Sequence, residues 1–213
     1  MAAVVGIFGT SGHARELADI VAACGGQPVF IARDAAEAAG CGLTGEAIVI
    51  EGELAGAGLG DYAIGVGDNH IRQRIAERYA GQLNFCNLVH PSASFGRGQR
   101  ERLARARGVA VCAGVRFTNQ IEIGDFTLFN QNATIAHDVI VEDYVCLAPG
   151  AHVSGNVHLE LGAWIGTGAS VIQGTPERRL RIGRHCTVGA GAAVVRDCEA
   201  GGVYVGVPAR RMR

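Results

Sequence analysis

The feature that most constrains the fold is a six-residue repeat in the second half of the chain. Written in sixes from residue 111, the sequence reads VCAGVR, FTNQIE, IGDFTL, FNQNAT, IAHDVI, VEDYVC, LAPGAH, VSGNVH, LELGAW, IGTGAS and VIQGTP. The first position of every hexad is a large apolar residue, and the fifth is small or β-branched. One hexad is a short strand plus a turn, which can bury its apolar side only by stacking on its neighbours. The repeat therefore predicts a parallel β-helix.

Two inserts depart from this regular pattern. After an offset of about five residues, TPERR (175–179), the frame resumes as IGRHCT, VGAGAA and VVRDCE. The offset and the residues up to 181 are expected to form an inserted loop of unassigned purpose. The segment RGQRERLARARG (97–108) precedes the regular frame and predicts an exposed loop or a short helix.

The first part of the chain has a different period. Apolar runs at 4–8, 28–33, 47–50 and 62–67 alternate with helical patterns at 14–25 and 70–80. Strands that alternate with helices indicate a small parallel α/β sheet. The sequence thus predicts two domains, a Rossmann-like α/β domain over residues 1–85 and a β-helix over residues 86–213.

Composition narrows the classes of function. The 19 basic and 20 acidic residues give a formal net charge of −1, so no polyanionic partner such as nucleic acid is indicated. No apolar run approaches the roughly 20 residues of a membrane span, and the first residues lack the basic segment of a signal peptide. The seven cysteines contain no CxxC pair, which is typical of a reduced, cytoplasmic protein without structural zinc.

Several motifs together resemble one enzyme family. The hexad frame that ends in VYVGVPARRMR is similar to the left-handed β-helix acyltransferases, and VVGIFGTSGHARELADIV, GVGDNHIRQRIA and LVHPSA narrow the resemblance. Over essentially its whole length the chain resembles the sialic acid O-acetyltransferase and bacillosamine or perosamine N-acetyltransferase group. The resemblance implies a left-handed β-helix that forms a homotrimer, with acetyl-CoA between neighbouring helices. It also implies a nucleotide-linked sugar on the α/β domain.

The hexad IAHDVI holds the main catalytic candidates. Ile135 and Val139 take inward positions, which turns His137 and Asp138 towards the outside. Acetyl transfer requires a base for the attacking amine or hydroxyl and donors for the developing oxyanion. The match to the family's His-acidic pair implies that His137 is the base and Asp138 its orienting partner. The alternative is a surface histidine without a catalytic role.

Stacking of the coils predicts the neighbours of this histidine. Three hexads per coil, as the resemblance implies, would place residues 18 apart about 4.8 Å from one another. Asn119 would then lie below His137 and Gly155 above it. Gly155 could offer its backbone N–H to the thioester oxygen. Asn130, seven residues before His137, could help to place the acceptor or could belong to an inward asparagine ladder.

Other residues match positions that contact CoA in the family. Cys146 stands where the family often has a histidine against the thiol arm, so it is a candidate contact, with a small packing residue as the favoured alternative. The other family CoA positions are Thr167, Gly168, Gly189 and Ala190. Four arginines around the inserted loop could meet CoA phosphates or form a solvated face: Arg178, Arg179, Arg181 and Arg184.

The motif GTSGH (9–13) links a strand to a helix N-terminus, where free N–H groups and the helix dipole favour phosphate. In the family's pattern Ser11, Gly12 and His13 would contact the phosphates or sugar of the nucleotide, and a simple tight turn is the alternative. Two further strand ends carry the remaining candidate contacts, for which solvated loops are the alternative: Arg33, Asp34, Gly67, Asp68 and Asn69.

The leading prediction is an acetyl-CoA-dependent acetyltransferase that acts on the amino group of a UDP- or GDP-linked amino sugar in surface glycan biosynthesis. The same machinery could O-acetylate a sialic-acid-type sugar instead. A β-helical carbonic anhydrase needs three histidines on a metal, and His137, His152 and His158 fall in no common column, so no metal is expected. A non-catalytic structural trimer also remains open.

Overall fold

A four-stranded parallel sheet forms the first part of the computed structural model, which describes residues 3–212. Its order is β3-β2-β1-β4, with β1 (Val4–Phe8), β2 (Gln27–Ala32), β3 (Ile48–Ile50) and β4 (Asp61–Ile64). The connecting helices are α1 (Gly12–Ala23), α2 (Ala35–Gly40), the 3-10 helix η1 (Glu51–Gly56) and α3 (Asn69–Arg78). The predicted α/β sheet is confirmed, and α2 and η1 are additions to it. Residues 1–2, at the start of the predicted α/β domain, and residue 213, at the end of the predicted β-helix domain, lie outside the described residues.

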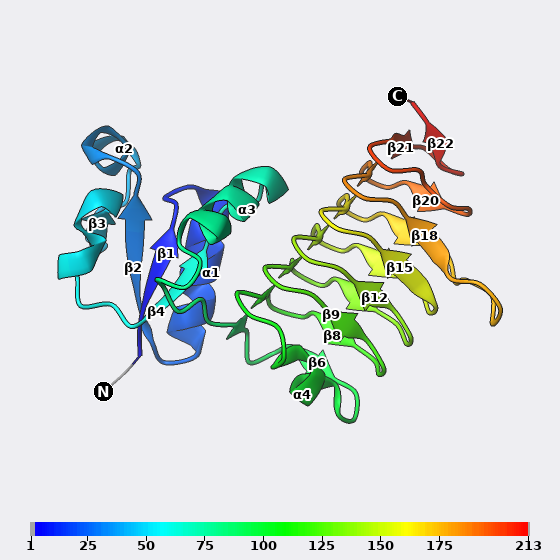
Figure 1. The fold of residues 1–213 in the computed structure, drawn as a ribbon, viewed down its shortest axis with the longest axis horizontal. Coiled ribbons are helices and arrows are strands. Elements are labelled where there is room, and N and C mark those ends of the chain that lie inside the picture. Colours follow the sequence, from blue (N-terminus) through cyan, green and yellow to red (C-terminus); the bar gives the residue numbers. More distant parts are fainter. Residues whose placement is uncertain (1–2, 213) are drawn as a thin grey trace.

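The second part is a β-helix built from short strands on three faces (Figure 1). The first face contains β5 (Leu88–Val89), β7 (Ala110–Val111), β10 (Leu128–Phe129), β13 (Cys146–Leu147), β16 (Trp164–Ile165), β19 (Thr187–Val188), β21 (Val203–Val205) and β22 (Arg210–Arg211). The second face contains β6 (Ser94–Phe95), β8 (Arg116–Phe117), β11 (Thr134–Ile135), β14 (His152–Val153), β17 (Ser170–Val171) and β20 (Ala193–Val194). The third face contains β9 (Glu122–Ile123), β12 (Ile140–Val141), β15 (Val157–Leu159) and β18 (Leu180–Ile182).

Strand register shows that one coil takes three hexads. Leu128 of β10 pairs in parallel with Cys146 of β13, 18 residues later. The inserted loop changes this register once, because Val157 of β15 pairs with Leu180 of β18. The extra residues therefore leave the coil without disturbing the strands on either side. The predicted left-handed β-helix is confirmed.

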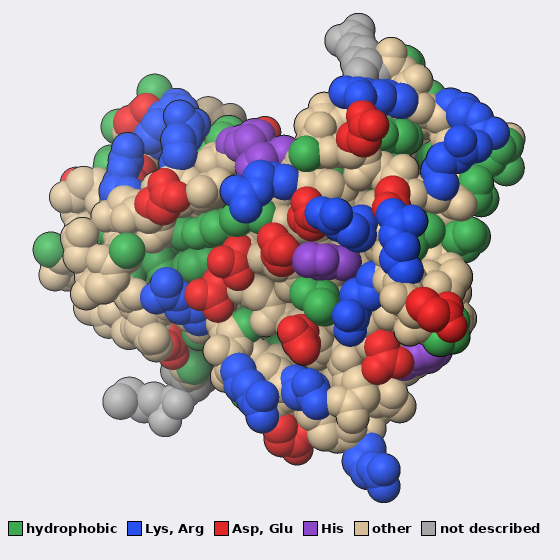
Figure 2. Space-filling view, turned by 45° about the vertical axis from the view of Figure 1, so that its right-hand side comes forward, with side chains coloured by type: hydrophobic (Ala, Val, Ile, Leu, Met, Phe, Trp, Pro, Cys, Tyr) green, Lys and Arg blue, Asp and Glu red, His purple; other side chains and the backbone are tan. Residues whose placement is uncertain are grey.

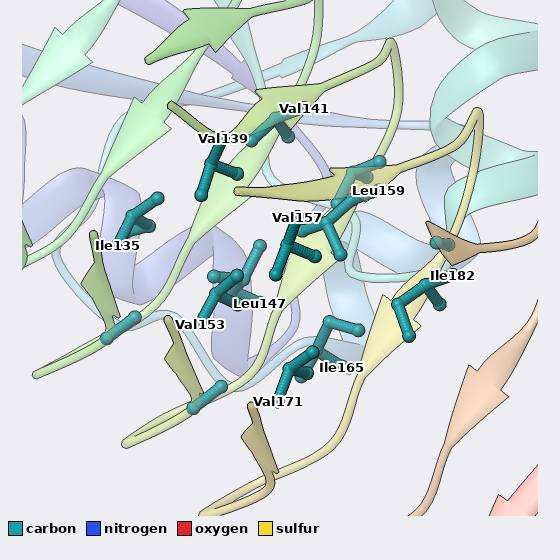
Figure 3. Packing of buried hydrophobic residues seen from close by; sticks show 14 of the residues in the cluster. Ile135, Val139, Val141, Leu147, Val153, Val157, Leu159, Ile165, Val171 and Ile182 are labelled. Carbon is teal, nitrogen blue, oxygen red and sulfur yellow. The ribbon is translucent and has the colours of Figure 1, made fainter. Parts of the chain in front are cut away.

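The first position of the hexads fills the interior of the β-helix. Figure 3 shows Ile135, Val153 and Val171 stacked from coil to coil, and all three are buried. Ile123 is only partly buried, because β9 is the first strand of its face and has a strand neighbour on one side only. Thr175, which the hexad frame counts as an inward fifth position, is exposed because the loop has already left the coil.

The segment 97–108 contains a short helix, α4 (Gln99–Leu103), which is one of the two forms expected from the sequence, and Gln99 and Leu103 of this helix are buried. The Gln99 side chain donates through Nε2 to the Ile121 carbonyl and accepts the Ile121 N–H through Oε1, both at 2.9 Å. Leu103 is buried in the β-helix core. The insert therefore covers the first coil, and its hydrogen bonds satisfy backbone groups at the edge of that coil.

The α/β domain covers the first face of the β-helix. Leu17 and Ile20 of α1 share one apolar cluster with Leu88, Leu128 and Cys146, whose side chains point outward from that face. The strand bridge between Tyr62 and Phe85 continues the N-terminal sheet up to the start of the β-helix. None of the described helices is long and apolar enough to cross a membrane. Figure 2 shows acidic and basic side chains interspersed over the visible face.

Candidate active site

His137 and Asp138 lie on the corner between the second and third faces, between β11 and β12. Nδ1 of His137 is 2.7 Å from Oδ2 of Asp138, and the two side chains are 47% and 53% exposed. Asp138 has a φ of 58°, a left-handed conformation that aspartate tolerates better than most residues. An Nδ1–H held by the carboxylate leaves Nε2 as the proton acceptor. The outward His137–Asp138 pair expected from the sequence is present.

Gly155 lies directly against the imidazole ring. A Cβ atom at Gly155 would be 2.6 Å from Cε1 and 2.7 Å from Nε2 of His137, so a side chain there would displace the ring. The backbone N–H of Asp138 donates to the Asn119 carbonyl at 3.3 Å, and that of Asn156 donates to the His137 carbonyl at 2.9 Å. The predicted column of Asn119, His137 and Gly155 therefore exists.

Asn130 occupies a different corner, between the first and second faces. It is buried, and its amide donates to the Leu147 carbonyl at 2.8 Å. The residues one coil below and above it are Cys112 and Ala148, so it does not belong to an asparagine ladder. Asn130 precedes β11 whereas His137 follows it. The two side chains therefore do not lie together within a single chain.

Cys146 is not exposed to solvent, which favours packing over the predicted contact with CoA. Its side chain is 1% exposed and lies in the cluster beneath α1. Burial raises the pKa of the Cys146 thiol to about 11. The alternative given by the sequence, a small packing residue, describes its place in the structure.

The other predicted CoA positions share the corner of Asn130. Thr167, Gly168 and Ala190 are exposed there, and Gly189 is half-buried. Backbone bonds stack this corner from coil to coil, with Gly168 N–H donating to the Pro149 carbonyl at 3.0 Å. The CoA positions and His137 thus lie on the two corners that border the second face.

A cavity of about 480 Å³ continues the His137 corner towards the C-terminal end. The Gly174 N–H donates to the Gly155 carbonyl at 3.1 Å, and Gly174 lines the cavity. Arg179 and Arg196 also line it. Arg178 is paired with Asp197 and Arg181 with Glu160, which favours a solvated face for these two arginines. Arg184 is exposed.

A second cavity, of about 420 Å³, lies at the carboxyl edge of the N-terminal sheet. Gly9 of the GTSGH motif and Arg33 line it, and the exposed Ser11 and Gly12 follow Gly9 at the start of α1. The structure adds lining residues that the sequence did not single out: Glu37, Glu51, Ile71, Arg74, Ile75 and Arg78. The sequence could have identified the last four of these residues by their spacing along α3, because residues three and four apart lie on the same helix face.

The other candidate nucleotide contacts have structural partners. Asp34 caps α2 by accepting the Glu37 N–H at 2.9 Å, and this bond together with the Arg33 side chain lowers the pKa of the Asp34 carboxyl. Asp68 caps α3 in the same way through the Ile71 N–H. The Gly67 carbonyl accepts from the Arg72 side chain. The buried Asn69 amide donates to a carbonyl of the β-helix, which favours a structural role for this side chain over the predicted nucleotide contact.

His13 is largely enclosed at the start of α1. Its Nδ1 is 3.0 Å from Oε2 of Glu16, its side chain is 13% exposed, and its Nε2 is buried without a hydrogen-bond partner. Burial lowers the pKa of His13 below the ordinary value of 6.5, and the Glu16 contact opposes this effect only in part. The folded state therefore favours the neutral form of this imidazole.

The His13 pKa predicts a loss of stability in mild acid. As pH falls below about 6.5, His13 takes up a proton in the unfolded chain but not in the folded one, so the free energy of unfolding decreases. Above that pH both states are neutral and no such loss occurs. In denaturant titrations between pH 7 and pH 5, His13→Gln should lose less stability than the wild type. Equal pH slopes for the two proteins would contradict the assignment.

The histidines relevant to a metalloenzyme have separate partners. His137 contacts Asp138, His152 contacts Thr134 at 2.8 Å, and His158 contacts Glu142 at 2.7 Å. Within residues 3–212, no group of three or more His, Cys, Asp or Glu side chains is arranged to hold a metal ion. This separation gives the carbonic anhydrase alternative no support.

Comparison with known proteins identifies relatives of both parts of the chain. Residues 5–79 match the family model described as the PglD N-terminal domain. The GDP-perosamine N-acetyltransferase of Escherichia coli O157:H7 is 31% identical over 153 residues, which cover 71% of this chain and 67% of that protein.

Solved structures match the whole chain. PerB from Caulobacter crescentus, in complex with CoA and GDP-perosamine, is 29% identical with a TM-score of 0.85 over 100% of this chain and 98% of its own. Variants of that enzyme with one histidine replaced by asparagine or alanine have the same two molecules bound. The acetyltransferase domain of PglB from Neisseria gonorrhoeae, in complex with acetyl coenzyme A, is 27% identical with a TM-score of 0.85 over both full chains.

The fold, the outward His-Asp pair and these relatives agree with the family expected from the sequence. The chain belongs to the perosamine and bacillosamine N-acetyltransferase family of left-handed β-helix sugar acetyltransferases.

Proposed function

We propose that this protein transfers the acetyl group of acetyl-CoA to the amino group of a nucleotide-linked amino sugar, with a GDP-linked sugar as the first candidate. The observation that carries the proposal is the half-exposed His137–Asp138 pair packed against Gly155. Relatives that bind CoA together with GDP-perosamine support the substrate class. The seven unpaired cysteines suit a reducing, cytoplasmic setting, which forms part of the proposal.

In the proposed mechanism His137 acts as the general base. Its Nε2 accepts a proton from the sugar amine as the nitrogen attacks the thioester carbonyl, and Asp138 stabilises the resulting imidazolium. The Gly155 N–H donates to the oxyanion of the tetrahedral intermediate. Collapse of that intermediate breaks the carbon–sulfur bond, and the imidazolium returns the proton to the departing thiolate.

A homotrimer would complete this site. His137 and the CoA positions Thr167, Gly168, Gly189 and Ala190 lie on different corners of one chain. The second and third faces are not covered by the α/β domain, which packs on the first face. A neighbouring chain placed against an open face could bring its own corner to His137. Analytical ultracentrifugation should then give a mass of three chains.

The two parts of the chain would divide the binding of the two substrates. Residues 1–85 would hold the nucleotide at the cavity lined by Gly9 and Arg33, where the N-terminus of α1 favours phosphate. Residues 86–213 would hold acetyl-CoA, with Arg179 and Arg196 near its phosphates.

The direct test is thiol release from acetyl-CoA in the presence of a panel of UDP- and GDP-linked amino sugars. Mass spectrometry of the product, followed by mild base that cleaves O-acetyl esters but leaves N-acetyl amides, separates the N- and O-transfer alternatives. A sialic-acid-type sugar belongs in the same panel. The proposal fails if no sugar nucleotide releases the thiol.

Gly155→Ala should lower kcat by roughly 10- to 100-fold, because the new methyl group displaces the His137 ring by an ångström or more. The ring is half exposed and can rotate away, so the thermal midpoint should change little. Steady-state kinetics and a melting curve check both expectations. Gly60→Ala is the matched control, because a Cβ atom there meets nothing within 4 Å. Wild-type turnover by Gly155→Ala would show that the ring position does not matter.

A further inference from the structure

A ladder of backbone carbonyls runs up the corner between the third and first faces. Phe126, Tyr144 and Gly162 stack there at intervals of 18 residues, and the column continues at His185 beyond the loop insertion. All four residues adopt left-handed φ values, between 53° and 66°. The coils therefore repeat one backbone geometry along this corner.

The first turns of α3 supply donors that match this ladder. Asn69 Nδ2 donates to the Gly162 carbonyl, and Arg72 donates to the other two, through Nη2 to Tyr144 and through Nε to Phe126, each at 2.8 Å. One side of α3 thus contacts three successive coils. Figure 1 shows α3 between the sheet of the α/β domain and the β-helix.

A fourth contact extends the ladder by one coil. The ring of His70 stacks on that of His185, with the centroids 4.8 Å apart. The His185 ring itself lies over Gly162, where a Cβ atom would be 2.4 Å from its Nδ1. We call Asn69, His70 and Arg72 the α3 clamp.

Arg72 is the centre of the clamp and is fully buried. It also donates to the Val66 and Gly67 carbonyls at 3.1 and 3.0 Å, and to Oδ1 of Asn69 at 2.7 Å. Burial lowers the pKa of its guanidinium to about 10, so it remains charged at neutral pH. A buried charge is tolerated only when its donors are satisfied. These donors are satisfied together only when the α/β domain sits at one angle on the β-helix.

The clamp also contacts the loop that borders the nucleotide cavity. Val66 lines that cavity, and its carbonyl accepts from Arg72. Apolar packing of α1 on the first face already attaches the domain, but such packing is non-directional. The hydrogen bonds of the clamp add the orientation that apolar contact does not specify.

We propose that Asn69 and Arg72 are positioning residues, which hold the nucleotide cavity at a fixed distance and angle from the acetyl-transfer corner. The catalytic consequence rests on the division of substrate binding proposed above, whereas the contacts of the clamp do not. Misplacement of a substrate by about 1 Å can reduce turnover by 10²-fold. Loss of the clamp therefore acts on kcat more than on the affinity for either substrate.

The test uses the full-length variants Arg72→Met, Arg72→Lys and Asn69→Ala. Lysine keeps the charge but lacks the planar fork of donors. Asn69→Ala removes the hydrogen bond to the Gly162 carbonyl. These two milder variants test the proposal even if Arg72→Met folds poorly. We expect kcat with the sugar nucleotide to fall roughly 10- to 100-fold per folded molecule. Calorimetric dissociation constants for acetyl-CoA and for the sugar nucleotide should stay within about threefold. Gln73→Met is the matched control, because it removes a side-chain hydrogen bond to Glu77 on the same helix and leaves the clamp residues in place.

A second measurement reports on the domain angle itself. Spin labels carried by noncanonical residues at the exposed positions Glu46 and Glu177 give the distance distribution between the two parts of the chain. The distribution should be narrow in the wild type and broader in the clamp variants. An unchanged distribution, or unchanged kcat per folded molecule, would overturn the proposal. If the wild type acetylates no sugar nucleotide, the proposed function fails, and the label distances still decide whether the clamp sets the angle.

Discussion

Replacement of His137 by alanine is expected to lower kcat by about 10²- to 10⁴-fold, while the affinity for acetyl-CoA changes little. The half-exposed imidazole can accept a proton through Nε2, and Oδ2 of Asp138 lies 2.7 Å from its Nδ1. Alanine removes the base and leaves the buried wall of the coil, Ile135 and Val139, untouched. Steady-state kinetics with a sugar nucleotide, together with calorimetric binding of acetyl-CoA, measure the two quantities.

Two further variants make the result specific. His90→Ala removes a histidine that contacts Ser92 at 2.8 Å, and it should turn over like the wild type. Asp138→Asn keeps the size of the side chain but loses the charge that stabilises an imidazolium, so its kcat should fall by less than that of His137→Ala. A folded His137→Ala variant with wild-type turnover would remove His137 from the mechanism.

Replacement of Phe129 by alanine should reduce the free energy of unfolding by about 3–5 kcal/mol. Phe129 is fully buried in the β-helix, and its ring meets that of Phe117 edge-on with centroids 4.9 Å apart. Each coil buries its apolar side only against its neighbours, so a cavity at this level weakens the contacts above and below it.

Denaturant titration of Phe129→Ala against the wild type measures this loss. Met212→Ala, at a position 59% exposed, is the control and should change the free energy of unfolding by no more than about 0.5 kcal/mol. A loss below 1 kcal/mol for Phe129→Ala would mean that the coil collapses around the missing ring.

The repeat made much of the β-helix predictable. A period of six fixes which side chains point inward, so the burial of Ile135 and Val139 and the outward turn of His137 follow from the sequence. The period also predicts the contact of His137 with Gly155, because residues 18 apart stack once three hexads form a coil. The family followed from the hexad frame together with the motifs of the α/β domain, and the relatives confirm it.

Residues that make contacts between distant parts of the chain were harder to predict. Cys146 and Asn69 matched positions expected to contact ligands, yet Cys146 lies beneath α1 and Asn69 contacts Gly162. Gln99 lies in a segment expected to be an exposed loop or a short helix, and its side chain forms hydrogen bonds with the backbone of Ile121. The hexad period does not predict these contacts, because in each case the partner comes from a distant part of the chain.

The resemblance to a known family implied the coil length. The sequence by itself therefore determined the β-helix and the inward and outward sides of each hexad. These properties are local or periodic, since burial of an apolar stripe depends on spacing alone. Only the tertiary structure decided that the α/β domain covers the first face and that Arg72 is buried among carbonyls of the ladder. Those properties depend on which surfaces meet, and the docking of α1 and α3 on the β-helix is set by contacts between residues far apart in the chain.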